Sequence, residues 1–292
     1  MTWIETVIIA IVEGLTEFLP VSSTGHMIIT QNLLGVVPED HMSPEAAFLN
    51  AFTFIIQFGA ILSVVCLYWK RFFQFDNTPA PVGSNLLQKL KHKYYFYWLL
   101  FVGLIPAVVI GMVAKKSGLL DWMLKSVWVV AIMLVLGGIF MLFCDRLFNK
   151  GSDKNKLNEK RAFNIGLYQC ISVIPGVSRS MATIVGGMTQ GLTRQRAAEF
   201  SFFLAVPTMA GATVLDVYSL LEDFGTTWLT TQNITTLILG CVVAFIVALL
   251  AMKWFVAFLT KYGFKAFGYY RIIVGGIILI LLLTGHSLAM VD

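Results

Sequence analysis

The chain has 292 residues, of which 58% are hydrophobic and only 13% are charged. Soluble globular proteins carry charges on about a quarter of their residues, so this composition excludes a soluble domain. The net charge of +5 indicates basic cytoplasmic loops more than nucleic-acid binding, because polytopic membrane proteins concentrate Lys and Arg in such loops.

The first residues do not have the pattern of a cleavable signal peptide, because no basic region precedes the apolar stretch and Glu5, Glu13 and Glu17 interrupt it. The four cysteines are scattered through apolar segments without CxxC spacing. This spacing predicts neither a disulfide framework nor a zinc site.

Six apolar segments are long enough, or nearly long enough, to cross a bilayer, which takes roughly 20 residues in a helix. We therefore predict an all-α polytopic membrane protein with six transmembrane helices. The predicted spans are Ala46–Trp69, Tyr94–Ala114, Val127–Cys144, Phe200–Leu215, Gln232–Met252 and Ile272–Val291.

Two further apolar stretches, 1–37 and 162–191, are each broken by a polar loop, "PVSSTGH" and "PGVSRS". The arm after each break is too short to cross the membrane. The pattern predicts two re-entrant helix–loop–helix hairpins, which are tolerated at membrane depth where they are buried in protein or line a cavity.

The basic residues are distributed unevenly over the predicted loops. Segments 70–93, 146–161, 190–196 and 253–267 hold 16 of the 21 Lys and Arg residues, the opposite side holds three, and Arg179 and Arg271 are the remaining two. The positive-inside rule therefore predicts that both termini lie outside.

Each half of the chain, 1–150 and 151–292, reads as one hairpin followed by three spans within a single integral membrane domain. Three spans is an odd number, so the halves are predicted to form an inverted repeat whose hairpin tips meet near the bilayer midplane. Such repeats are typical of transporters, so a transporter or flippase for a lipid phosphate is the alternative to an enzyme.

Three ionisable groups fall deep inside the hairpins: Glu13, Glu17 and Arg179. A charge inside the membrane costs about 2.5–3.5 kcal/mol and is a functional hypothesis by default. Glu13 and Glu17 lie one helical turn apart, so they must share a proton, bind a cation or face an arginine. A purely structural Glu17–Arg179 pair is one interpretation; a divalent cation, Mg²⁺ or Ca²⁺, held by Glu13 and Glu17 beside an anionic ligand is the other.

The two loops also concentrate hydroxyl groups at predicted helix starts, where they serve as ordinary caps or as ligands of an anion. With Arg179, they would form a phosphate-binding cage made of Ser22, Ser23, Thr24, Ser178, Ser180 and Thr183. His26 is either a packing residue or a general base for Ser23 or for a water. Together these groups favour phosphoryl transfer.

At this point "EGLTEFLPVSSTGH" (13–26) and "PGVSRSMAT" (175–183) resemble the two signature motifs of the undecaprenyl-pyrophosphate phosphatases, the BacA/UppP family. The resemblance extends over essentially the whole chain. It implies hydrolysis of a polyprenyl pyrophosphate to its monophosphate, which recycles the lipid carrier for cell-wall synthesis and confers bacitracin resistance. It also implies dependence on Mg²⁺ or Ca²⁺, a location in the bacterial inner membrane with the site open to the periplasm, and a homodimer.

By position, the resemblance makes Glu13 and Glu17 the acidic motif and Ser23 and His26 the catalytic pair. Whether Ser23 or His26 attacks phosphorus stays open. Pyrophosphate would be held by Ser178, Arg179 and Thr183. The acid-phosphatase-like lipid phosphatases are disfavoured, because they need a second histidine downstream and here only His286, near the end of the chain, follows Arg179.

Overall fold

The structure is a computed structural model that describes residues 1–38, 43–75, 78, 83, 85–116, 123, 126–286 and 288. Within these residues it is all-helical, with twelve α-helices, one 3₁₀ turn and no strand. Six of the helices are long and apolar enough to cross a membrane, which confirms a multi-pass membrane protein. They are α3 (Pro44–Leu67), α6 (Tyr95–Lys116), α8 (Val127–Phe148), α11 (Arg194–Phe224), α12 (Thr231–Tyr262) and α13 (Lys265–Leu283).

The two stretches predicted to be hairpins are each a pair of short helices around a loop. The first pair is α1 (Trp3–Thr16) and α2 (Ser23–Leu34), and the second is α9 (Glu159–Gln169) and α10 (Arg179–Thr189), with a 3₁₀ turn, η1 (Cys170–Val173), before the second loop. None of these four helices exceeds 14 residues, which is too short to span a bilayer.

Several helix ends differ from the sequence-based prediction. Segments 216–231 and 253–267, predicted as loops, are mostly helical, because α11 continues to Phe224 and α12 to Tyr262. Long Lys and Tyr side chains reach water while their backbone stays helical, so charge does not mark a helix end. A glycine with positive φ ends each helix instead, Gly225 at 61° and Gly263 at 75°. The last span, predicted as Ile272–Val291, starts at Lys265 and ends at Leu283, and half of positions 284–291 lie outside the described residues.

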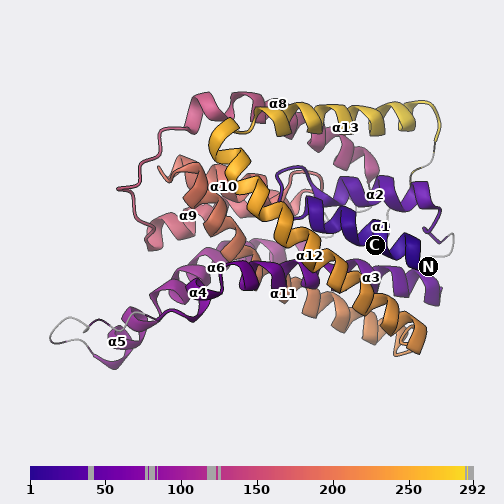
Figure 1. The fold of residues 1–292 in the computed structure, drawn as a ribbon, viewed down its shortest axis with the longest axis horizontal. Helices are drawn as coiled ribbons and strands as arrows, with labels where there is room; N and C mark the ends of the chain where they lie inside the picture. The colour runs from indigo at the N-terminus through magenta and orange to yellow at the C-terminus, as the bar shows by residue number, and fades with distance from the viewer. Residues whose placement is uncertain are drawn as a thin grey trace.

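Helix packing follows a crossed pattern between the two halves of the chain. In Figure 1, α8 and α13 run side by side along one edge of the bundle, and α3 packs against α11. Hairpin helix α1 packs on α12, while hairpin helix α9 packs on α6. Small residues allow these close approaches: a Cβ on Gly14 would lie 2.8 Å from the Ala244 carbonyl oxygen, and one on Gly166 would lie 2.2 Å from that of Gly103.

Two short helices follow the first span in the chain. α4 (Trp69–Phe73) continues α3, and α5 (Leu86–Lys93), which buries no residue, projects from the bundle at the lower left of Figure 1. The Lys91 ammonium ties α5 to α9 through Glu159, 2.9 Å away. This contact holds the pKa of the Glu159 carboxyl below its usual value.

Asp145, near the end of α8, joins three elements at the basic end of the bundle. Its Oδ1 accepts from Arg194 Nε and Nη2 at 3.0 and 2.7 Å, and its Oδ2 accepts from the Phe264 N–H at 2.8 Å. The Asp145 side chain is 17% exposed, so these charge-assisted bonds are largely shielded from water.

We predict that Asp145→Ala lowers the unfolding free energy by about 1.5–3 kcal/mol, because it leaves a mostly buried guanidinium and an amide unpaired. Thermal unfolding in detergent measures the effect. Asp153→Ala is the control: its side chain is 82% exposed and 3.5 Å from Arg196, so the expected change is below about 0.5 kcal/mol. Equal melting temperatures for the two variants would contradict the prediction.

Candidate active site

A cavity of about 240 Å³ lies where the two hairpin loops meet. The first loop and its neighbouring helices contribute Glu17, Ser22, Ser23 and Thr24, and the second contributes Ser178 and Arg179. Six of the ten predicted site residues therefore line one cavity, although the two loops are more than 150 residues apart in the chain.

The two loops share an unusual backbone conformation. Ser22 has φ 70° and ψ 101°, and Ser178 has φ 76° and ψ 113°, in a region that side-chain-bearing residues seldom occupy. Each of these serines immediately precedes a helix, so Ser23 and Arg179 are the first residues of α2 and α10. Strained residues of this kind concentrate at functional sites, because the surrounding structure must hold them in place.

Ser23 and Arg179 both contact the carboxylate of Glu17. The Ser23 hydroxyl donates to Oε2 at 2.7 Å, and Arg179 Nη2 lies 3.3 Å from Oε1. The Glu17 and Arg179 side chains are 8% and 12% exposed, so the pair is shielded from water but remains accessible from the cavity. The Glu17–Arg179 contact, one of the alternatives drawn from the sequence, is present, and Ser23 bonds the same carboxylate.

His26 lies beside the cavity but does not line it, and its ring is not bonded to Ser23. Its Nδ1 lies 2.8 Å from the Ser22 carbonyl oxygen, and its Nε2 lies 2.7 Å from the Tyr270 hydroxyl. A carbonyl only accepts, so Nδ1 carries a proton, and in the neutral ring Nε2 accepts from Tyr270. The Tyr270 ring also stacks on the imidazole, with centroids 5.4 Å apart.

Ser180 and Thr183 are fully buried and lie behind the cavity wall. The Ser180 hydroxyl donates to the Leu19 carbonyl at 2.8 Å, which joins the second hairpin to the first loop. The Thr183 hydroxyl lies 2.5 Å from that of Ser201 on α11. These contacts support a role in positioning the two loops more than direct contact with a ligand.

Glu13 lies one turn before Glu17 and is completely buried. Neither of its carboxylate oxygens has a hydrogen-bond partner among the described residues. An unpaired buried carboxylate is costly, so this position calls for a proton or a cation. The described residues contain no group of three or more His, Cys, Asp or Glu side chains that would hold a metal ion by themselves.

Comparison with known proteins identifies the family to which this site belongs. Residues 6–277 match the family described as bacitracin resistance protein BacA. The chain is 53% identical to the undecaprenyl-diphosphatase of Porphyromonas gingivalis strain W83 over 290 residues, which cover 99% of this chain and 100% of that protein. It is 49% identical to the undecaprenyl-diphosphatase of Flavobacterium psychrophilum and 45% identical to that of Bdellovibrio bacteriovorus, with both chains covered completely in each case.

The chain belongs to the BacA family. The family resemblance expected from the two motifs is thereby confirmed.

The BacA fold brings further polar residues to the site that the sequence analysis did not single out. Gln57 on α3 and Ser172 in η1 line the cavity, and Tyr270 on α13 fixes His26. Gln57 lies within the "AFTFIIQFGA" run, where a lone amide in an apolar helix was the available signal. Nothing local marks Tyr270, because its partner lies 244 residues earlier in the chain.

Arg271 is the other residue whose importance was not predicted. It is completely buried, and among the described residues its guanidinium donates only to backbone carbonyls and to the Met181 thioether. Nη1 bonds the carbonyls of Pro20 and Val177 at 3.2 and 3.0 Å, and Nη2 bonds that of Gly176 at 2.7 Å. Arg271 therefore joins the first loop to the second on the side away from the cavity.

The α8 backbone completes the set of acceptors for Arg271. Nε bonds the Leu134 carbonyl at 3.3 Å and Nη2 bonds the Met133 carbonyl at 3.0 Å. Gly137 leaves room for the guanidinium, because a Cβ there would lie 2.4 Å from Nη2. Five carbonyls thus replace the water that the cation loses on burial.

We predict that Gly137→Ala displaces the Arg271 guanidinium, destabilises the protein by about 1–3 kcal/mol and lowers catalytic turnover, because the two loops lose their common support. Gly111→Ala on α6 is the matched control, since a Cβ there meets nothing within 4 Å. Melting temperature and turnover, measured in detergent, check both variants. A Gly137→Ala protein as stable and active as Gly111→Ala would contradict this role of Arg271.

Proposed function

We propose that this protein is a phosphatase that hydrolyses undecaprenyl diphosphate to undecaprenyl phosphate and inorganic phosphate, which recycles the lipid carrier for cell-wall synthesis and confers bacitracin resistance. The observation that carries the proposal is the convergence of Ser23 and Arg179 on Glu17 in the cavity between the hairpin loops. A hydroxyl, a carboxylate and a guanidinium at one point suit phosphoryl transfer. The undecaprenyl-diphosphatases to which the chain is 45–53% identical support the choice of substrate.

The diphosphate would bind in the cavity between the starts of α2 and α10. Helix starts favour anions, because their first N–H groups are free and the helix dipole is positive there. Arg179 would add a planar, permanently charged fork for two phosphate oxygens. The prenyl chain would lie along apolar helix faces.

We propose that Ser23 attacks phosphorus, because its hydroxyl lines the cavity while the His26 ring does not. Ser23 Oγ would bond the terminal phosphorus as the bond to the bridging oxygen breaks, and its proton would pass to Glu17, 2.7 Å away. The lipid would leave as a monophosphate. Water would then cleave the phosphoserine, which releases inorganic phosphate and restores the hydroxyl of Ser23.

His26 would act through the loop rather than on phosphorus. Its Nδ1–H holds the carbonyl of Ser22, the residue with the strained backbone directly before Ser23. The Tyr270 hydroxyl holds the opposite ring nitrogen, so the imidazole is fixed from both sides. In this proposal His26 and Tyr270 orient the nucleophile.

The carboxylates of Glu13 and Glu17 would hold a Mg²⁺ or Ca²⁺ ion, with phosphate oxygens of the substrate as further ligands. Mg²⁺ is usually held by one or two carboxylates together with substrate phosphates, and Glu13 offers two buried oxygens without a partner among the described residues. A bound metal would supply positive charge at the phosphate groups.

We also propose the finer topology: two re-entrant hairpins in an inverted repeat of 1–150 and 151–292, with both termini and the cavity mouth on the periplasmic side of the inner membrane. The crossed packing supports the repeat, because each hairpin contacts the second span of the other half and the third spans contact each other. The matched dihedral angles of Ser22 and Ser178 support it independently. The concentration of basic residues at the opposite end supports the orientation.

We predict that Ser23→Ala and Arg179→Ala each lower the release of inorganic phosphate from a polyprenyl diphosphate by at least about 100-fold, because each removes a group that contacts the reacting phosphate. His26→Ala should also lower turnover, through loss of loop geometry. Phosphate release by purified protein in detergent is the measurement, with Thr260→Ala on the exposed face of α12 as a control of unchanged activity.

Full activity in one of these variants would refute the role assigned to that residue. The same assay separates the enzyme from a lipid-phosphate transporter, the alternative that an inverted repeat favours. A transporter without phosphatase activity releases no phosphate, and detergent provides no second compartment.

We predict that excess EDTA abolishes turnover and that added Mg²⁺ or Ca²⁺ restores it. Glu13→Gln should raise the metal concentration needed for half-maximal activity, because it removes a charged ligand. Turnover that persists in EDTA would contradict a metal site and assign the two glutamates to proton transfer.

A further inference from the structure

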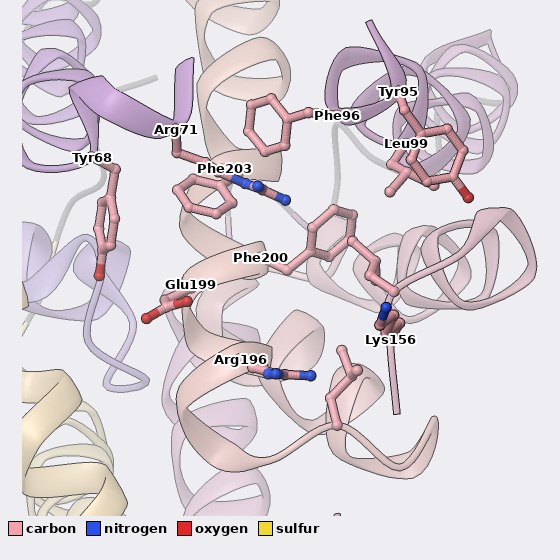
Figure 2. Close-up of a pocket in the computed structure, with 12 residues that line it drawn as sticks. Tyr68, Arg71, Tyr95, Phe96, Leu99, Lys156, Arg196, Glu199, Phe200 and Phe203 are labelled. Atoms are coloured by element: carbon pink, nitrogen blue, oxygen red, sulfur yellow. The ribbon is translucent and has the colours of Figure 1, made fainter. Parts of the chain in front are cut away.

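A second and larger cavity, of about 530 Å³, lies at the basic end of the bundle. Its walls come from α4, α6, the segment before α9 and the first turns of α11 (Figure 2). Its volume falls in the range of small-molecule sites, which is about 300–1,000 Å³. Nothing in the proposed phosphatase chemistry uses this cavity.

The inner wall of this cavity, which we call the basic cavity, is aromatic. Phe203 on α11 and Phe96 on α6 pack edge to face with ring centroids 5.2 Å apart, and Phe200 lies beside them. Phe200 and Phe203 are 3% and 7% exposed, so the wall is firmly packed. A surface of this kind suits an apolar chain.

Cations surround the aromatic wall. Figure 2 shows the nitrogen-bearing ends of Arg71, Arg196 and Lys156 around the ring of Phe200. The Arg71 guanidinium lies 5.0 Å from the ring centroid of Phe96, a cation–π contact that leaves its N–H edge free for an anion.

These cations are only partly neutralised. Among the described residues, neither Arg71 nor Lys156 has a carboxylate at ion-pair distance. Arg196 Nη1 donates to the carbonyls of Asp153 and Asn155 at 2.8 and 3.2 Å, which holds its guanidinium in place, and its Nε lies 3.5 Å from the exposed carboxylate of Asp153. Of the described residues that line the cavity, Glu199 is the one acidic side chain. The lining residues alone therefore carry a net charge of +2, and the Asp153 carboxylate, which lies outside the lining and is 82% exposed, offsets this charge only weakly because water screens it.

The basic cavity is separate from the cavity between the hairpin loops. Among the described residues, none lines both cavities. Phe202 closes the space between them, because it packs on Phe18 with centroids 5.4 Å apart and on Tyr68 at 6.5 Å. Helix α11 therefore presents Phe200 and Phe203 to one cavity, while its Ser201 carbonyl accepts from Arg179 at the other.

From these observations we propose that the basic cavity binds a lipid with a phosphate monoester head, its phosphate between Arg71, Lys156 and Arg196 and the first part of its chain on the aromatic wall. A phosphate monoester carries about −1.5 to −2 charges near neutral pH, which matches the net +2 of the lining. A phosphodiester lipid carries a single negative charge and matches less well. The proposal does not depend on the phosphatase activity.

The experiment counts bound copies of farnesyl monophosphate on the full-length protein by native mass spectrometry from a neutral detergent. We expect two copies on the wild-type protein, one in each cavity. R71Q/K156Q should bind the copy in the basic cavity at least tenfold more weakly, while Arg179→Ala should lose the other copy.

K70Q/K154Q is the matched control, because it removes the same charge from the same two segments at residues that do not line the cavity. It should bind two copies. Phosphate release from a polyprenyl diphosphate should stay within twofold of wild type in both double variants, which separates this site from the proposed active site.

Two copies bound with unchanged affinity to R71Q/K156Q would overturn the proposal. Competition by equal concentrations of inorganic phosphate would overturn the requirement for a lipid chain, and competition by farnesol would overturn the requirement for a phosphate. Equal competition by phosphatidylglycerol would overturn the preference for a monoester.

Discussion

The site depends on one buried cation. Arg271 lies completely inside the protein, where a guanidinium is tolerated only if its donors are all satisfied. Its acceptors are main-chain carbonyls of Pro20 in the first loop, of Gly176 and Val177 in the second, and of α8. A buried cation that loses any of these acceptors is left with an uncompensated desolvation free energy. Arg271 therefore couples the position of each loop to that of the other. This coupling explains how two separate hairpins hold a constellation accurate enough for chemistry.

On the cavity side of Arg271, the two loops share one backbone conformation but carry different side chains. Ser22 and Ser178 have nearly the same φ and ψ, so the residues that follow them, Ser23 and Arg179, occupy equivalent places at the starts of α2 and α10. Both reach the carboxylate of Glu17. In the proposed chemistry, one supplies the nucleophile and the other neutralises charge on the phosphate. Two loops with matching backbone angles thus differ in chemistry through their side chains alone.

Helix α11 lies between the two cavities. Its Phe202 fills the space between the hairpin cavity and the basic cavity, and its Ser201 and Phe203 contact opposite sides. The partition keeps the carboxylates of the hairpin site away from the cations at the basic end, so each cavity retains its own charge. A diphosphate site and a monophosphate site can therefore coexist in one bundle.

The sequence by itself determined the helical class, the spans, the two broken hairpins and the BacA-family motifs, because hydrophobic length, loop breaks and intramembrane charge are local properties. It also gave the contact of Glu17 with Arg179 as one of several alternatives, since a buried carboxylate needs an opposite charge or a proton. The ends of α11, α12 and α13 depend on how far each helix continues through the membrane–water interface. The positions of charged residues in the sequence do not indicate that distance. Only the tertiary structure assigned Tyr270 to His26, turned Ser180 and Thr183 away from the cavity, and gave Arg271 its carbonyls. The physical reason is the same in each case: these contacts join residues from different helices, and only packing of the whole bundle decides which groups share a buried space.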